Sequence, residues 1–168
     1  MALFEILVIL ASIIVYYILQ LKDKSLWKKF TITFVGVLLF EYFTQALWFN
    51  KNLESWAYLY LDVSWIITLG WTFIILASIA IIDSFCNKYS EKKRYVFSIL
   101  LASAVGFIAE ALVRNIGIRE YAARTQEFLS GVQLLSVPIE AFYYIPVFMA
   151  LIIAFKKYWE INYLGGRK

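Results

Sequence analysis

Long apolar runs alternate with short charged segments along the 168 residues of the chain. Five of these runs are close to, or longer than, the ~20 residues that a helix needs to cross a bilayer. They predict five transmembrane helices, at about residues 3–21, 30–49, 59–82, 95–113 and 132–155. The first run has Glu5 near its start and no basic segment before it, which indicates a retained helix rather than a signal peptide. Because no linker interrupts the pattern, we expect residues 1–168 to form a single integral membrane domain, an all-α bundle of five transmembrane helices.

The basic residues predict how these helices are oriented. Twelve of the 16 Lys and Arg residues fall on one side, namely Lys22, Lys24, Lys28, Lys29, Lys88, Lys92, Lys93, Arg94, Lys156, Lys157, Arg167 and Lys168. Basic loops stay on the cytoplasmic side of a membrane, so the N-terminus is expected outside and the C-terminus inside. The sequence therefore predicts a multi-pass protein of the cell membrane. Its net charge of +4 is explained by loops that face anionic lipid headgroups, and no nucleic-acid partner is expected.

The second and third runs resemble the fourth and fifth runs. Each pair follows a lysine-rich segment and carries a glutamate in its first run, Glu41 or Glu110. Similar strings follow in the outer loops, at residues 53–57 and 118–122. Because the two copies are separated by an even number of helices, they would form a parallel repeat.

The composition excludes several classes of catalytic site. Without histidine the chain cannot hold a Ser-His-Asp triad or an HExxH zinc site, and its one cysteine, Cys86, cannot form an intrachain disulfide or a cysteine metal cluster. Neither a glycine-rich phosphate loop nor a dinucleotide-binding pattern occurs. We therefore expect no metal and no cofactor, and the remaining chemistry is that of carboxylates, tyrosines and a few arginines.

Four acidic residues in or beside the apolar runs are the candidate catalytic groups. A charge at the centre of a transmembrane helix costs about 2.5–3.5 kcal/mol, so such residues usually face a partner or a cavity. We expect Glu41 near mid-depth, Glu110 and Glu140 in the outer half and Asp62 at the outer boundary, all lining one pocket. Pro138 should bend the helix beside Glu140, which makes Glu140 the strongest candidate.

An apolar pocket disfavours the charged form of a carboxyl group, so these acids could donate a proton to a hydrocarbon double bond. Glu140 and Glu110 are the expected acid and base, with Glu41 and Asp62 in support. Nearby aromatic faces would stabilise the resulting carbocation. The expected substrate-binding residues are Trp65, Trp71, Tyr143, Tyr144, Gln45 and Gln133. A structural alternative stays open for Glu110, because Arg114 lies four residues later and could form an ion pair with it.

The string Pro138-Ile139-Glu140, with Glu110, Gly117, Tyr121 and Gly131, resembles the repeat of small membrane-embedded lycopene cyclases and related carotenoid-biosynthesis membrane proteins. In that family each repeat has an acidic residue, a glycine-aromatic outer loop and a Pro-Leu-Glu-Glu motif. The resemblance is closer for residues 110–155 than for 41–82, and Ala141 replaces the second glutamate of the motif. It implies a helical membrane enzyme that protonates an isoprenoid or carotenoid, as a cyclase or hydratase does. Fungal membrane terpene cyclases are similar in size and also rely on buried acids.

Two other functions remain open at this stage. Outward-facing carboxylates would also suit a small transport or binding module for a cation or small solute. A non-catalytic subunit of a membrane complex is the other alternative, because Ala102 and Gly106 lie four residues apart in the spacing that lets helices approach closely. A transport module would bind a small solute, and an assembly subunit would bind another helix or a second copy of the chain. An enzyme would bind a lipid-soluble substrate in the bilayer.

Overall fold

Five long helices make up most of the protein, whose computed structural model describes residues 2–163. They are α1 (Ala2–Gln20), α2 (Leu26–Thr44), α3 (Trp65–Phe85), α4 (Glu91–Asn115) and α6 (Ala141–Tyr163). Four of them, α1, α3, α4 and α6, are long and apolar enough to cross a membrane, which indicates a multi-pass membrane protein. The helix α2 is as long as α1 but carries Lys28, Lys29 and Glu41.

Short strands join the helices at one end of the bundle. β1 (Trp48–Asn50) pairs antiparallel with β4 (Arg119–Tyr121). Two hairpins lead into the helices that follow them: β2 (Tyr58–Tyr60) with β3 (Val63–Ser64), and β5 (Gln133–Leu134) with β6 (Val137–Pro138). The expectation of a helical bundle is thus confirmed for most of the chain, whereas the connecting segments at this end contain strands that an all-α fold does not include.

These strands shorten three of the predicted helices. Helix α3 starts at Trp65 rather than at residue 59, because the hairpin β2–β3 occupies the segment before it. α2 ends at Thr44 rather than at residue 49, because residues 48–50 pair with β4 instead of continuing the helix. Glu41 therefore lies three residues before the last residue of α2 and not in the middle of the helix. Helix α6 starts at Ala141 rather than at residue 132, because the hairpin β5–β6 occupies that segment. Since Pro138 belongs to β6, the predicted helix bend beside Glu140 is wrong; the proline within α6 is Pro146.

Two halves of the described chain have the same order of elements: helix, strand, short helical turn, hairpin and helix. The first half is α2, β1, a 3-10 turn (Ser55–Ala57), β2, β3 and α3. The second is α4, β4, α5 (Ala123–Gln126), β5, β6 and α6. The strand β4 corresponds to β1 at 48–50, so the predicted match of residues 118–122 with 53–57 has the wrong register. Because β1 and β4 also pair with each other, equivalent segments of the two halves meet at the end of the bundle that carries the strands.

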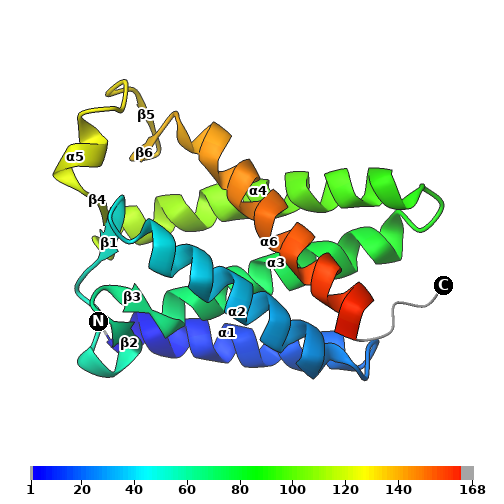
Figure 1. The fold of residues 1–168 in the computed structure, drawn as a ribbon. Helices are drawn as coiled ribbons and strands as arrows, with labels where there is room; N and C mark the ends of the chain where they lie inside the picture. The colour runs from blue at the N-terminus through cyan, green and yellow to red at the C-terminus, as the bar shows by residue number, and fades with distance from the viewer. Residues whose placement is uncertain (1, 164–168) are drawn as a thin grey trace.

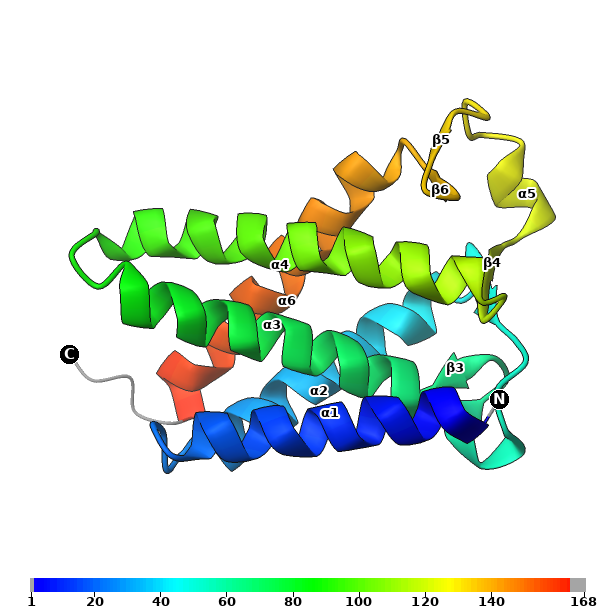
Figure 2. The ribbon, with the colours of Figure 1, turned by 180° about the vertical axis from the view of Figure 1, so that it is seen from behind.

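The helices form two layers. Figures 1 and 2 show that α1, α3 and α4 lie side by side, with α3 in the middle, and form the first layer. α2 and α6 form the second layer and cross one face of the first. Buried side chains from α2, α3, α4 and α6 form the core, including Val37, Trp71, Ala102 and Met149. Gly106 lets α4 pack closely against α3 and α6, because a Cβ at this position would lie 2.9 Å from Trp71 Cζ3 and 2.8 Å from Met149 Cε.

The lysine-rich segments gather at the end of the bundle opposite the strands. The α1–α2 and α3–α4 connections lie there together with the last turns of α6 (Figure 1). Ion pairs tie this end together: Lys29 with Asp23, Arg94 with Asp83 and Lys157 with Glu91, each at 2.6 Å. The basic residues Arg167 and Lys168 lie outside the described residues.

Candidate functional site

A buried arginine, Arg119, joins two of the predicted acids at the strand end of the bundle. Its Nη2 atom donates to both carboxylate oxygens of Glu41, at 2.9 and 3.0 Å, and its Nη1 lies 3.4 Å from Oε2 of Glu110. All three side chains are at most 5% exposed. Charge-assisted contacts of this kind are stronger than hydrogen bonds between neutral groups. The result is a buried ionic centre shared by α2, α4 and β4.

The pairing of β1 with β4 places Arg119 in this centre. Side chains alternate between the two sides of a strand, so Arg119 and Tyr121 point inward while Glu120 points outward and pairs with Lys51. Arg119 faces Asn50 across the strand pair, and its Nε donates to Asn50 Oδ1 at 3.0 Å.

Two tyrosines extend the centre by hydrogen bonds. The Tyr121 hydroxyl donates to Oε1 of Glu110 at 3.1 Å, and it also contacts the hydroxyl of Tyr144 on α6. Burial raises the pKa of Tyr121, and the nearby Glu110 raises it further, so this phenol keeps its proton and remains a donor. Arg114 lies with its guanidinium carbon 4.5 Å from the centre of the Tyr121 ring. A continuous chain of hydrogen-bonding groups therefore runs from Glu110 to Tyr144. We call this set the Arg119 cluster, comprising Glu41, Asn50, Glu110, Arg119, Tyr121 and Tyr144.

Arg119 is charged in this environment. Burial acts to lower the pKa of Arg119, but the attraction of Glu41 and Glu110 outweighs it and raises the pKa above its ordinary value. A third predicted acid, Asp62, lies close by, since its backbone carbonyl accepts a hydrogen bond from Asn50 at 2.9 Å. Partial burial raises the pKa of Asp62, and the charge on Glu41 adds to this effect. Three of the four predicted acids thus lie around one guanidinium.

The fourth predicted acid, Glu140, has a different partner. Its Oε1 accepts the backbone N–H of Ser130 at 2.6 Å, at the base of the β5–β6 hairpin. This hydrogen bond lowers the pKa of Glu140, so the carboxylate is ionised at neutral pH. Its Oε2 is buried and has no hydrogen-bond partner among the described residues.

The predicted partner of Glu110 also differs in the structure. Arg114 donates from Nε to the backbone carbonyl of Ser136 at 2.5 Å, and the cation that contacts Glu110 is Arg119. A spacing of four residues along a helix brings two side chains near each other but does not ensure that they make contact. Glu110 therefore forms an ion pair, as the structural alternative expected, but with Arg119 of β4 and not with Arg114.

The predicted substrate-binding residues fall in several places. Tyr144 belongs to the Arg119 cluster, whereas its neighbour Tyr143 is 75% exposed on the outside of α6. Trp65 donates from Nε1 to the backbone carbonyl of Trp56 at 2.9 Å. Trp71 is buried in the core, and Gln133 is exposed in β5.

Two buried polar atoms beside the cluster lack a partner within the described part of the chain. They are Oε1 of Gln45, one turn after Glu41, and Nε1 of Trp48. The Trp48 ring centre lies 5.6 Å from the guanidinium carbon of Arg119. Buried polar groups are normally hydrogen-bonded, so these two atoms are available to a water or to a polar group of a ligand.

Sequence reasoning missed Asn50, Arg119 and the role of Tyr121. Arg119 is not among the predicted site residues, and Tyr121 enters the sequence analysis only through the resemblance to the cyclase repeat. One signal was present, because two acids inside a membrane bundle require a counter-charge.

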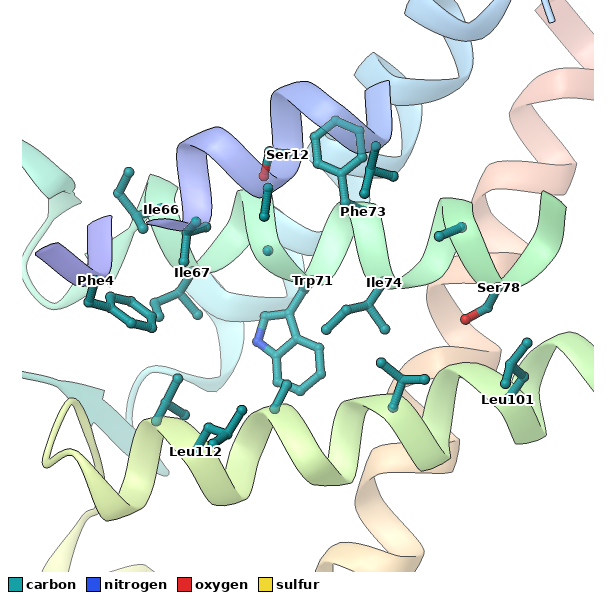
Figure 3. A pocket seen from close by; sticks show the side chains of 18 of the residues that line it. Phe4, Ser12, Ile66, Ile67, Trp71, Phe73, Ile74, Ser78, Leu101 and Leu112 are labelled. Carbon is teal, nitrogen blue, oxygen red and sulfur yellow. The ribbon is translucent and has the colours of Figure 1, made fainter. Parts of the chain in front are cut away.

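An apolar groove of about 450 Å³ lies on another face of the bundle, between α1, α3 and α4 (Figure 3). Ser12 and Ser78 are the polar residues among those lining it, and none of the four predicted acids lines it. Trp71 connects the groove to the core, because it lines the groove and packs edge-on against Phe148 with ring centres 5.4 Å apart. The protein thus has a polar cluster and a separate apolar groove.

Metal binding finds no support in the arrangement of side chains. Within residues 2–163, no group of three or more His, Cys, Asp or Glu side chains is placed to hold a metal ion. Comparison with known proteins gives no family for the chain: no protein-family model, curated protein or solved structure matches it.

Proposed function

We propose that this protein is a membrane-embedded enzyme that protonates an unsaturated, lipid-soluble substrate such as an isoprenoid, with Glu110 as the proton donor. The observation that supports this proposal is the Arg119 cluster. It holds two buried carboxylates at one guanidinium and links one of them through Tyr121 to Tyr144.

The proposed arrangement in the membrane has five spanning helices, with the N-terminus outside and the C-terminus inside. α2 is counted as the fifth because it has 19 residues and packs against both α3 and α6. The basic connections at one end of the bundle support this orientation. The common order of elements supports a parallel repeat of the pairs α2–α3 and α4–α6.

Charge counting assigns the transferable proton to Glu110. Two ionised carboxylates facing one guanidinium would leave a negative charge uncompensated in a buried site, which is costly. One proton on the pair removes that charge. Glu41 engages Arg119 with both oxygens, whereas Glu110 makes one longer contact to Arg119 and one to the neutral phenol of Tyr121. Glu110 is therefore the better carrier of the proton.

The reaction then proceeds in two balanced steps. Glu110 adds its proton to a carbon–carbon double bond, which leaves a carbocation on the substrate and a carboxylate that Arg119 stabilises. A proton lost from a neighbouring carbon returns to Glu110, so the product has the formula of the substrate, as in cyclisation or double-bond isomerisation. The aromatic faces of Trp48 and Tyr144, with ring centres 6.0 Å apart beside the cluster, suit the stabilisation of the cation.

The test compares Glu110→Gln with Glu140→Gln in a host whose membranes contain unsaturated isoprenoids such as lycopene. General acid catalysis contributes about 10²–10⁴-fold, so Glu110→Gln should lower product formation, measured by chromatography of lipid extracts, at least about 100-fold. Glu140→Gln serves as the matched control and should retain most of the conversion. Unchanged conversion by Glu110→Gln, or a loss confined to Glu140→Gln, would contradict the assignment of Glu110.

The alternative of a cation-binding or cation-transport module receives less support. Arg119 already lies between the carboxylates that such a module would use, and a second cation would be repelled by the guanidinium. The alternative of a non-catalytic assembly subunit predicts that Glu110→Gln changes association with other chains and leaves lipid composition unchanged.

A further inference from the structure

A further groove lies at the basic end of the bundle, between the beginning of α4 and the second half of α6. Its volume of about 450 Å³ falls within the ~300–1,000 Å³ that is typical of ligand sites. Each helix contributes three of the residues that line it, namely Lys92, Tyr95 and Val96 from α4 and Ala154, Lys157 and Tyr158 from α6. Two of these residues are positively charged, so this basic groove differs from the apolar groove between α1, α3 and α4.

A hydrogen bond holds the two helices together beside the basic groove. The Tyr95 hydroxyl donates to the backbone carbonyl of Ala150 at 3.1 Å and so joins α4 to α6. The walls of the groove carry the short side chains of Val96 and Ala154, and both residues are exposed. The space between the two helices is therefore left open by small apolar side chains on either wall.

The charge in the basic groove is positive. Lys92 and Lys157 are among its lining residues, whereas no acidic residue is. Lys92 has no ion-pair partner within residues 2–163. Lys157 pairs with Glu91 at 2.6 Å, but the two side chains are 43% and 70% exposed. An exposed ion pair of this kind contributes little free energy, so it does not prevent Lys157 from binding another anion.

The charged and apolar residues of the basic groove are arranged in order of depth. Since α4 begins at the basic end, Val96 lies about 6 Å deeper than Lys92 along the helix, at ~1.5 Å per residue. Since α6 ends there, Ala154 lies about 4.5 Å deeper than Lys157 along its helix. A phospholipid has the same order of groups, with its phosphate at the membrane surface and its acyl chains below. A free anion would contact the lysines and leave the apolar walls uncovered, so the arrangement favours a lipid.

We propose that the basic groove is a binding site for an anionic phospholipid, whose phosphate lies between Lys92 and Lys157 and whose acyl chain lies against Val96 and Ala154. Basic pockets between transmembrane helices on the cytoplasmic side suit anionic headgroups, and the proposed orientation places this end of the bundle in the cytoplasm. The inference goes beyond the proposed reaction, because the groove lies at the opposite end from the Arg119 cluster and contains none of the residues assigned to proton transfer.

The experiment titrates the purified full-length chain in detergent with phosphatidylglycerol, phosphatidylcholine or inorganic phosphate and counts bound molecules by native mass spectrometry. The unmodified chain should bind phosphatidylglycerol more tightly than phosphatidylcholine. Lys92→Gln combined with Lys157→Gln should lower the affinity for phosphatidylglycerol at least about tenfold, because each basic residue near an anionic lipid adds about fivefold to binding. Ala154→Trp and, separately, Val96→Trp fill the groove from either wall while both lysines remain, and each should cause a similar loss.

The matched control is Lys24→Gln combined with Lys88→Gln, which removes the same charge from exposed lysines that do not line the groove. It should bind phosphatidylglycerol like the unmodified chain, and thermal unfolding in the same detergent identifies the variants that remain folded. If the control loses as much affinity as the groove variant, only the overall charge attracts the lipid and the proposal is wrong. It is also wrong if folded Ala154→Trp and Val96→Trp chains bind phosphatidylglycerol normally. Displacement of the lipid by inorganic phosphate would likewise overturn it, because the ligand is then a free anion.

Discussion

Arg119 is held by side chains from three elements: Glu41 of α2, Glu110 of α4 and Asn50 of β1. These contacts use Nε, Nη1 and Nη2, so the planar guanidinium serves three acceptors in different directions. A lysine ammonium carries the same charge but cannot present this fork of donors. The geometry of the cluster therefore depends on an arginine and not only on a positive charge.

Replacing Arg119 with leucine should destabilise the protein strongly. The substitution leaves the buried carboxylate of Glu41 without its counter-charge, and removal of one partner from a buried ion pair costs about 3–5 kcal/mol. Arg124→Leu is the matched control, because Arg124 is exposed on α5 and should change stability by less than about 0.5 kcal/mol. Unfolding in detergent, followed by circular dichroism, measures both effects. Adding Glu41→Gln to Arg119→Leu should recover part of the loss, and an equal stability of Arg119→Leu and the unmodified chain would contradict the buried ionic centre.

The acids of the cluster could be predicted from the sequence, but their partner could not. Glu41 and Glu110 stand out because charged residues are rare in apolar runs. Arg119 lies in the short strand β4, 78 positions after Glu41, and no local pattern indicates that the two meet. The helix bend expected beside Glu140 does not form for a physical reason: Pro138 bends a helix only if the helix has already begun, and here a hairpin precedes α6.

At the scale of elements, length and apolar composition were sufficient to predict the five long helices. The strands were not predictable, because each has only two or three residues and lies in an aromatic-rich segment. Their hairpin turns also lack the usual sequence signal. Such turns favour Gly or Asn at positive φ, whereas here Leu61, Leu135 and Ser136 adopt φ values of 48°, 53° and 66°. Because these turns lack glycine, no local pattern indicates that the predicted helices at 59–82 and 132–155 begin only after a hairpin.

Two glycines on neighbouring helices should respond differently to alanine. Gly106→Ala places a methyl group 2.9 Å from Trp71 Cζ3 and 2.8 Å from Met149 Cε, so the contact of α4 with α3 and α6 must shift at a cost of about 1–3 kcal/mol. Gly70→Ala meets its nearest atom at 3.8 Å and should be neutral or stabilise α3 by up to about 1 kcal/mol. Unfolding of both variants in the same detergent provides the comparison. Equal stabilities would mean that Gly106 is not a point of close helix packing.

The two ends of the molecule differ in charge and in structure. Lysine-rich connections and their ion pairs lie at one end, while the paired strands and the Arg119 cluster lie at the other (Figure 1). In the proposed orientation the cluster is at the outer side of the membrane. Cys86, the single cysteine of the sequence, follows α3 at the opposite, basic end.

The position of Cys86 allows a direct test of this orientation. In intact cells a membrane-impermeant maleimide should leave Cys86 unlabelled, and labelling should appear after the membrane is permeabilised. A Cys86→Ser chain with Glu127→Cys, at an exposed position near the strands, should react from outside. Labelling of Cys86 in intact cells, together with protection of the cysteine at position 127, would invert the proposed orientation.

The ionic centre also sets a condition on how the protein is made. Glu41 and Arg119 are 78 residues apart, and synthesis at about 5–20 residues per second separates their appearance by roughly 4–16 s. During this interval the nascent chain contains the acid but not its counter-ion. α2 therefore cannot reach its final packing until residue 119 has been made, and a polypeptide released earlier would hold Glu41 without its partner, so that its carboxyl group would have to take up a proton to enter an apolar environment.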